Sequence, residues 1–338
     1  TAYKCLDDRS SLGILLNYSA NADDLLTKKL VSIRDPEKYN AQDAVCGFIG
    51  GGNYASRVLI PAFKEADAKL DTLLTSGGVS AIHHGKKNDF ANASTDLSQL
   101  LENNAVNTVV IATQHNLHAE QVIQAINSGK NVFVEKPLAL NHTELDAIES
   151  AYNEQKGKCR VMVGYNRRFA PHVIKMKSLL TNVLEPKAFI MTMNAGAIPS
   201  DHWTQNPEVG GGRIIGEACH YIDLMRFLVG SEITGYTATC MGKADGVDIT
   251  EDKASITLTF KDGSFGTINY LANGGKGFAK ERIEVFANDG VLQLDNFRKL
   301  IGYDWNGFSK DKLRAQDKGQ SNCSKAFINS IKSGTSSP

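Results

Sequence analysis

The sequence predicts an α/β chain in which a doubly wound parallel sheet is followed by an α+β domain with an open, mostly antiparallel sheet. Three observations support this fold class. Short apolar strands alternate with helical segments from Val45 to Gly164, which is typical of βαβ units. A glycine-rich turn follows the first of these strands. After about residue 165 the strands lengthen, alternate apolar with polar side chains, and are joined by Asp-Gly turns.

The pattern divides the chain into three parts. Residues 1–44 are expected to form an N-terminal extension and linker, in which Ala2–Leu6 resembles the end of a helix and Leu12–Tyr18 a strand. Residues 45–165 are expected to form the parallel-sheet domain, and residues 166–338 the α+β domain.

In the parallel-sheet domain each expected strand is a short apolar run, and each expected helix lies between two such runs. Gly129 predicts the end of one helix, and Asn141 predicts an N-cap with the acidic Glu144 in the first turn. The strands are expected at 45–49, 70–75, 108–112, 131–134 and 160–164, and the helices at 56–66, 79–88, 96–102, 119–128 and 142–155.

In the second domain the strand 254–260 alternates strictly between apolar and polar side chains. The turns 261–263 and 288–290 predict hairpins, because Asp and Gly tolerate positive φ. Further strands are expected at 188–193, 235–240, 264–271, 283–287 and 291–294, and helices at 171–180, 217–229 and 324–330.

Composition excludes several classes of function. The 338 residues suffice for two domains of roughly 100–200 residues each. Lys plus Arg equals Asp plus Glu at 37 each, so no net charge attracts nucleic acid or an acidic membrane. No apolar run reaches the ~20 residues of a membrane helix. The six scattered cysteines predict reduced thiols in a cytoplasmic protein and no metal site.

The glycine-rich turn reads Gly50-Gly51-Gly52-Asn53-Tyr54-Ala55, between a strand and a helix. The first glycine allows a tight turn, and Gly52 lets the backbone approach a pyrophosphate at the helix N-terminus. Ala55 replaces the third glycine and still permits close packing of the helix on the strand. We therefore expect Gly50, Gly52, Asn53 and Tyr54 to bind a dinucleotide; the alternative is a turn that only needs positive φ.

The second strand lacks the acidic residue that usually accepts a hydrogen bond from the ribose 2′-hydroxyl group. It ends Thr75-Ser76-Gly77-Gly78. Nothing there repels a 2′-phosphate, and Ser76 is the expected ribose contact. The cofactor is therefore NAD or NADP, with a slight preference for NADP that Lys86 or Lys87 would support.

A polar segment from Thr113 to His118 follows the strand 108–112. The carboxyl end of a parallel strand faces the cofactor crevice, so Thr113 and His118 are candidate cofactor contacts. The alternative is that His118 begins a helix and donates a hydrogen bond to a loop carbonyl.

The tripeptide Glu135-Lys136-Pro137 ends the strand 131–134. Proline stops the strand, which fixes the lysine at the edge of the crevice. There Lys136 can hydrogen-bond a substrate oxygen and share its proton, and Glu135 lies beside the cofactor. A lysine after an apolar strand is otherwise an ordinary surface residue.

A second block runs from Gly210 into a helix that carries Glu217, His220 and Asp223. Their i, i+3, i+6 spacing places all three on one helix face. We expect a carboxylate three residues away to hold the imidazole and raise its pKa, leaving the other ring nitrogen for a hydroxyl proton. An ion-paired surface face is the alternative.

Three further residues are substrate candidates. Asn166 and Arg167 lie where the two domains join, and one of the arginines Arg167 and Arg168 is expected to pair with an acid there. Trp203 lies in a polar loop and can stack on a sugar ring.

Taken in order, these blocks resemble the glucose–fructose oxidoreductase / inositol dehydrogenase (Gfo/Idh/MocA) family over about residues 45–333. The matching segments are 48–53, 110–113 with His118, Ala125 with 129–130, 135–137, 164–169 and 210–223. The resemblance implies a Rossmann domain, an open-sheet domain, NAD or NADP, and homo-oligomers built by packing sheet faces. It also implies oxidation or reduction of a CH–OH group in a sugar, nucleotide sugar or polyol.

In this family the motif lysine and histidine, which correspond to Lys136 and His220, are the expected acid–base pair. Family members commonly have an aspartate four residues before the histidine, but here that position is Gly216. The Gly-Glu-x-Cys-His variant and residues 1–20 are similar to two-part proteins of polysaccharide biosynthesis with a preceding zinc alcohol dehydrogenase-like domain. The alternative function is a non-catalytic dinucleotide-binding sensor.

Overall fold

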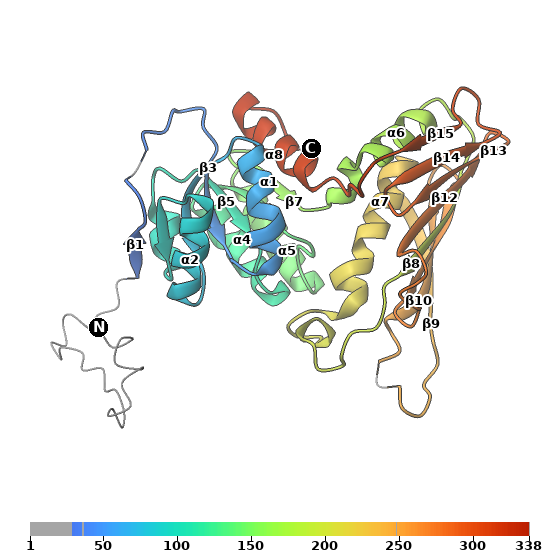
Figure 1. The fold of residues 1–338 in the computed structure, drawn as a ribbon, viewed down its shortest axis with the longest axis horizontal. Helices are drawn as coiled ribbons and strands as arrows, with labels where there is room; N and C mark the ends of the chain where they lie inside the picture. Colours follow the sequence, from blue (N-terminus) through green and yellow to red (C-terminus); the bar gives the residue numbers. More distant parts are fainter. Residues whose placement is uncertain (1–28, 36, 248, 338) are drawn as a thin grey trace, which may run out of the picture.

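The computed structural model describes residues 29–35, 37–247 and 249–337, which form two domains side by side (Figure 1). The segments Ala2–Leu6 and Leu12–Tyr18, for which a helix end and a strand were expected, lie outside these residues. Across the described ranges, no helix combines the length and apolar character needed to cross a bilayer.

The first domain contains a seven-stranded sheet with the order β1-β4-β3-β2-β5-β6-β7. All neighbouring strands are parallel except β1 and β4. The strands are β1 (Leu30–Ser32), β2 (Val45–Ile49), β3 (Lys69–Leu74), β4 (Asn92–Ser94), β5 (Thr108–Ile111), β6 (Asn131–Val134) and β7 (Val161–Val163). The predicted parallel sheet is confirmed; β1 and β4 were not predicted, and β1 places part of the expected linker in the sheet.

Helices cover both faces of this sheet. They are η2 (Ala55–Leu59), α1 (Ile60–Glu65), α2 (Gly78–Asn88), α3 (Leu97–Glu102), η3 (His115–Leu117), α4 (His118–Asn127) and α5 (His142–Glu154). The predicted cap is present, since the Asn141 side chain accepts a hydrogen bond from the Glu144 N–H group at 2.9 Å.

The second domain contains an eight-stranded sheet with the order β15-β14-β13-β12-β8-β11-β10-β9. Only the β8–β11 pair is parallel, so the predicted mostly antiparallel sheet is confirmed. The strands are β8 (Ala188–Asn194), β9 (Ile233–Cys240), β10 (Lys253–Phe260), β11 (Phe265–Leu271), β12 (Glu281–Ala287), β13 (Gly290–Asp295), β14 (Lys299–Tyr303) and β15 (Lys310–Lys312). The strands β14 and β15 were not predicted.

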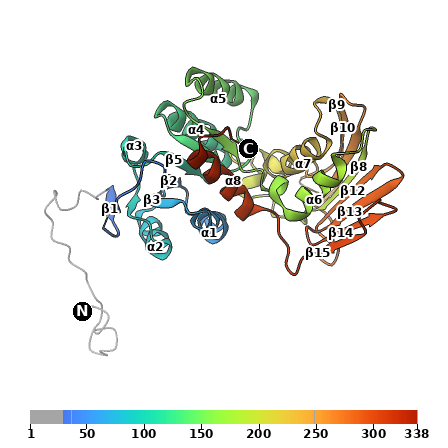
Figure 2. The same ribbon diagram turned by 90° about the horizontal axis from the view of Figure 1, so that it is seen from above.

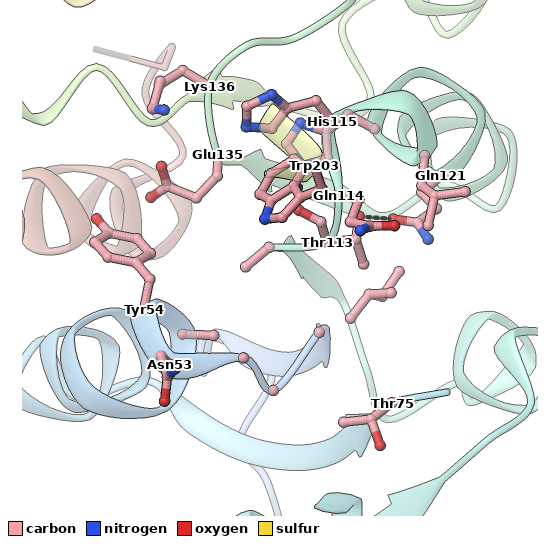
Figure 3. A pocket seen from close by; sticks show the side chains of 18 of the residues that line it. Asn53, Tyr54, Thr75, Thr113, Gln114, His115, Gln121, Glu135, Lys136 and Trp203 are labelled. Carbon is pink, nitrogen blue, oxygen red and sulfur yellow. Dashed lines mark hydrogen bonds between the residues drawn. The ribbon is translucent and has the colours of Figure 1, made fainter. Parts of the chain in front are cut away.

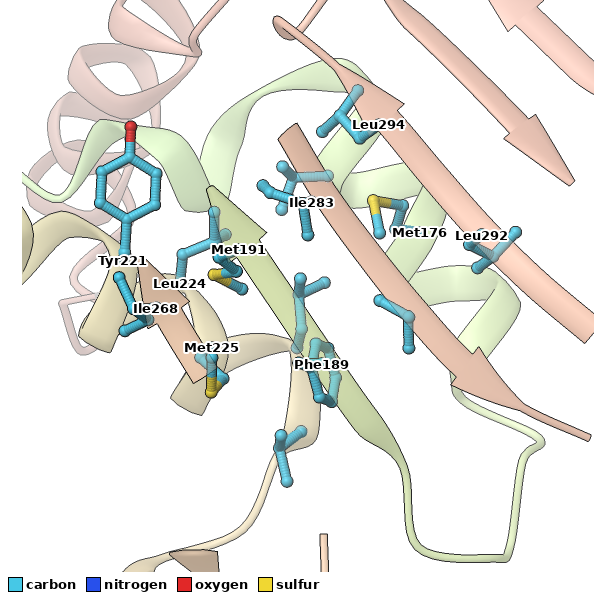
Figure 4. Close-up of a cluster of buried hydrophobic side chains, with 14 of the residues drawn as sticks. Met176, Phe189, Met191, Tyr221, Leu224, Met225, Ile268, Ile283, Leu292 and Leu294 are labelled. Atoms are coloured by element: carbon cyan, nitrogen blue, oxygen red, sulfur yellow. The ribbon is translucent and has the colours of Figure 1, made fainter. Parts of the chain in front are cut away.

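Two helices, α6 (Pro171–Leu180) and α7 (Cys219–Val229), lie between this sheet and the first domain (Figures 1 and 2). The core of the domain forms where they pack on one face of the sheet. There Leu224 and Met225 of α7 are buried with Phe189, Met191 and other strand residues (Figure 4). Short helices η4 (Asn166–Phe169), η5 (Trp203–Gln205) and η6 (Ile214–Ala218) connect the layers. On the opposite face of the sheet, none of the helices that the structure describes is present (Figure 2).

The chain ends with α8 (Gln320–Ser333), which returns to the first domain (Figure 2). Its Phe327 ring packs against Phe133 and Phe63, with centroids 5.5 Å and 6.4 Å away. The sequence prediction gave this helix residues 324–330 and assigned it to the second domain. Its position is corrected here: the apolar face of α8 completes the core of the parallel-sheet domain.

Candidate functional site

A cavity of about 1230 Å³ opens at the carboxyl ends of β2, β3, β5 and β6 and extends to α7 of the second domain. This is the edge at which parallel α/β sheets bind ligands. A smaller adjoining cavity of about 350 Å³ shares His115, Lys136, Arg167, Trp203 and His220 with it, among other residues. Both domains therefore contribute side chains to one continuous space.

The glycine turn forms one wall of the larger cavity (Figure 3). Gly50 has φ +102°, and a Cβ atom there would lie 2.3 Å from the Ala112 carbonyl oxygen, so only glycine fits. A Cβ atom on Gly52 would meet nothing within 4 Å. The open space beside Gly52 fits a pyrophosphate held close to the backbone, at the start of the helical segment η2.

Of the residues that the structure describes, those lining the wall beyond β3 carry hydroxyl groups and no charge. Thr75, Ser76, Ser80 and Thr95 line the cavity there. The Thr75 hydroxyl donates a hydrogen bond to the Gly77 carbonyl oxygen at 2.6 Å. Lys86 and Lys87, which the sequence offered as contacts for a 2′-phosphate, are in the last turn of α2 and are not among the lining residues.

Lys136 lies two residues after the end of β6 and lines both cavities. Its ammonium group donates a hydrogen bond to the carbonyl oxygen of Gly216 in η6 of the second domain. A backbone carbonyl of the second domain therefore holds the lysine.

Glu135 and Tyr54 both line the cavity, and the Glu135 carboxyl group points toward the Tyr54 ring (Figure 3). Its side chain is buried, and burial raises the pKa of the carboxyl group to about 7, against the opposing effect of Lys136. Near neutral pH this carboxyl group therefore carries only part of a negative charge.

His220 projects from α7 into the same space and lines both cavities. Its Nδ1 atom is buried and has no hydrogen-bond partner among the described residues. Burial holds the pKa of the imidazole well below its usual value, and the cations Arg167, Lys136, Lys318 and Lys280 act in the same direction. His220 is therefore neutral at pH 7.

The carboxylates on the helix face do not hold His220. Glu217 accepts hydrogen bonds from Arg213 at 2.9 Å and Tyr270 at 2.6 Å, and Asp223 is bound by Arg168. The predicted rise in the His220 pKa is therefore wrong, because the acids that share its helix face are taken by basic and phenolic groups of neighbouring elements. Asp223 does not line the cavity.

His118 is fully buried at the start of α4. Its Nδ1–H group lies 2.7 Å from the Pro137 carbonyl oxygen, to which it donates a hydrogen bond. This contact matches the alternative interpretation, in which His118 begins a helix and donates a hydrogen bond to a loop carbonyl. It also connects the segment after Lys136 to α4. His118 also lines the cavity, as does Thr113, whose hydroxyl donates to Gln121 at 2.7 Å.

Both arginines of the domain junction form ion pairs. Arg167 binds Glu281 at 2.7 Å in a buried pair, and Arg168 binds Asp223. Arg167 and Asn166 also line the cavity, although the Asn166 side chain donates to the Lys318 carbonyl oxygen at 2.7 Å.

Trp203 lines both cavities and packs edge-on against His115, with ring centroids 4.8 Å apart. His115 was not singled out in the sequence, although it lies inside the polar segment 113–118. Its Nδ1–H group donates to the Gly210 carbonyl oxygen at 2.7 Å, joining the first domain to the glycine loop of the second. Burial lowers the pKa of His115 to about 4.

Fourteen of the fifteen predicted site residues line the larger cavity, and Asp223 is the exception. The fourteen are Gly50, Gly52, Asn53, Tyr54, Ser76, Thr113, His118, Glu135, Lys136, Asn166, Arg167, Trp203, Glu217 and His220. The lining residues Lys280 and Lys318 were missed, because neither stands in a recognisable motif.

Two family models match the chain. One, described as an oxidoreductase family with an NAD-binding Rossmann fold, matches residues 44–165. The other, a Gfo/Idh/MocA C-terminal domain, matches residues 185–293. The chain belongs to the Gfo/Idh/MocA family. Its first domain is accordingly an NAD-binding Rossmann domain, as the sequence predicted.

Curated relatives in this family include an oxidoreductase of Formosa agariphila, 33% identical over 189 residues, which cover 53% of this chain and 58% of that protein. The myo-inositol 2-dehydrogenase of Thermotoga maritima is 30% identical over 216 residues, covering 61% and 62%. The chain thus spans about three fifths of the length of these relatives.

Solved structures share the fold. A probable dehydrogenase from Thermotoga maritima has a TM-score of 0.72 at 26% identity, over 86% of this chain and 89% of that one. A levoglucosan dehydrogenase in complex with NADH and levoglucosan has a TM-score of 0.75 at 20% identity, over 87% and 91%. The latter likeness concerns the fold alone.

Proposed function

We propose that this Gfo/Idh/MocA protein is an NAD(P)-dependent oxidoreductase that acts on a CH–OH group of a sugar or polyol. The observation that carries the proposal is the convergence of three features on one cavity: the glycine turn, Lys136 of the first domain and His220 of the second. Relatives that are named inositol dehydrogenases support the substrate class.

The cofactor's pyrophosphate would lie beside Gly52, where the backbone is open, and its nicotinamide end beside Lys136. When bound, the nicotinamide ring exchanges a hydride with the reacting carbon. Within the described part of the chain, the hydroxyl-lined wall near Ser76 contains neither an acid to repel a 2′-phosphate nor a base to bind it. We therefore expect both dinucleotides to bind, and competition between NAD and NADP would rank them.

In the direction of oxidation, the neutral His220 imidazole accepts the hydroxyl proton of the substrate. The Lys136 ammonium group hydrogen-bonds the same oxygen and stabilises negative charge as it develops there. Trp203 offers an aromatic face to the sugar ring. The two domains fix these groups relative to one another, and positioning supplies much of the rate enhancement.

The test is a screen of hexoses, inositols and nucleotide sugars for a change in cofactor absorbance at 340 nm. Turnover with at least one of these carbohydrates is the expected result. Tight binding of NAD or NADP without turnover on any of them would favour the alternative, a dinucleotide-binding sensor.

We also propose that the protein is a cytoplasmic homo-oligomer formed through the helix-free face of the second sheet. On that face Phe265 of β11, Ala188 of β8 and Phe286 of β12 stand in register across three neighbouring strands. Phe265 and Phe286 are 52% and 42% exposed, and Ile190 on the same face is 40% exposed. An apolar row of this kind is suited to a second copy of the chain.

A further inference from the structure

The substrate end of the cavity holds more cations than its carboxylates neutralise. Glu217 lies between two of them: Arg213 at 2.9 Å and Lys280 at 3.2 Å. The pKa of Glu217 is lowered to about 2 by Lys280, Tyr270 and Arg213 against the effect of burial, so this carboxylate is fully ionised. The single negative charge of Glu217 therefore neutralises only one of the two positive charges beside it.

The same arrangement recurs on the other side of His220. Glu281, only 1% exposed, binds both Arg167 at 2.7 Å and Lys318 at 2.8 Å. Arg167 and Lys318 line the cavity, whereas Glu281 lies behind them. A second carboxylate is thus shared by two cations. It is the cations, and not the carboxylate, that face the cavity.

Lys136 adds a positive charge that no carboxylate among the described residues pairs with, since its ammonium group binds the Gly216 carbonyl oxygen. Glu135, whose pKa is raised to about 7, contributes only part of a negative charge at neutral pH. Five cations thus face or border the cavity. The two fully ionised carboxylates there are each shared by a pair of these cations, so positive charge remains in excess.

We propose that the substrate is an anionic sugar whose carboxylate or phosphate group binds at the Lys280 side of the cavity, within reach of Arg213. Lys280 is the most exposed of the four cations that pair with Glu217 and Glu281, with a side chain 43% exposed, and it lines the cavity. This inference rests on the proposed function and narrows its substrate class.

Two physical arguments support an anion. An oxidised nicotinamide ring would add one more positive charge to the excess that Glu217 and Glu281 leave in this partly buried site. A neutral sugar would offset none of that excess, whereas an anionic sugar would. Burial is the main cause of the lowered pKa of His220, and an anion nearby would offset the further lowering that the four cations produce.

The experiment compares kcat/KM for four sugars of closely related shape: D-glucose, D-glucuronate, D-glucuronamide and D-glucose 6-phosphate. We expect at least a 30-fold preference for one of the two anions over glucose and the neutral amide. The carboxylate and phosphate arms identify which anion the site prefers.

The variant Lys280→Gln should reduce the ratio of kcat/KM for the preferred anion to that for glucose at least tenfold. The exposed Lys276→Gln, four residues earlier and outside the cavity, is the matched control and should leave the ratio within twofold. Equal or better turnover of neutral sugars would overturn this inference and leave the proposed function intact.

Calorimetric titration of the protein saturated with NADH separates the remaining outcomes. Preferential binding of glucuronate or glucose 6-phosphate over glucose, without turnover of any carbohydrate, would support the anion site and contradict the proposed oxidoreductase activity. Binding of both anions no tighter than glucose and the amide would overturn the anion site whatever the activity.

Discussion

Lys136 of the first domain donates a hydrogen bond to the carbonyl oxygen of Gly216 in the second. Gly216 lies in η6, four residues before His220 on the helical segment that continues into α7. One contact across the domain boundary therefore sets the position of the amine relative to the imidazole.

The two outer glycines of the turn should respond differently to substitution. Gly52→Val adds a side chain where a Cβ atom meets nothing within 4 Å, so we expect an unchanged melting temperature and at least a tenfold loss of dinucleotide affinity. In Gly50→Ala the new Cβ atom would lie 2.3 Å from the Ala112 carbonyl oxygen, and alanine would have to adopt the φ of +102° found at this position. We therefore expect a lower melting temperature. Thermal unfolding and NADH fluorescence titration measure both effects. Unaltered NADH affinity in Gly52→Val would contradict the placement of the pyrophosphate beside this turn.

His115 makes the protein sensitive to acid. Its pKa is about 4 in the folded state and near 6.5 when exposed, so only the unfolded chain binds a proton between these values. Stability is therefore lost as the pH falls from 6.5 towards 4. In His115→Gln the loss in unfolding free energy between pH 7 and pH 4.5 should shrink by about 2 kcal/mol.

Urea unfolding at the two pH values checks this expectation. His142→Gln, at the exposed first residue of α5, is the control and should keep the pH dependence of the unaltered protein. An identical pH dependence in His115→Gln and the unaltered protein would show that His115 is not buried as a neutral group.

The apolar row on the helix-free sheet face predicts how the assembly is disrupted. Phe265→Glu places a charge beside Ala188 and Phe286 in that row, and we expect it to dissociate the oligomer into monomers. Val79→Glu alters a residue that is 85% exposed on α2 of the other domain, and should leave the assembly intact. Light scattering coupled to size-exclusion chromatography gives the masses. A monomeric unaltered protein, or an oligomer that survives Phe265→Glu, would contradict the proposed interface.

The sequence predicted most of the fold because its signals are local. Apolar strands such as 45–49 and hairpin turns such as 261–263 are each specified within a few residues. The strands β1, β4 and β15 have only three residues each, which is too short for a clear pattern. In addition, β1 and β4 pair with each other across about 60 residues of chain. The docking of α8 on the first domain is likewise a tertiary effect.

The site was predicted in outline for the same reason. Lys136 and His220 stand in ordered motifs, and both line the cavity. The partners of Glu217 and Asp223 could not be read from their helical spacing, because Tyr270, Lys280 and Arg168 come from other elements. The spacing of a histidine and an acid on one helix shows that they share a face, and not that they bind each other.

In the proposed mechanism, Lys136 acts on the substrate and is not needed to bind the cofactor. Its direct test is to measure NADH affinity and turnover in Lys136→Met, with Lys158→Met at an exposed loop position as the control. For Lys136→Met we expect NADH affinity within threefold of the unaltered protein and a roughly 1000-fold fall in kcat, with no change in the control. Turnover of Lys136→Met at the unaltered rate would contradict it.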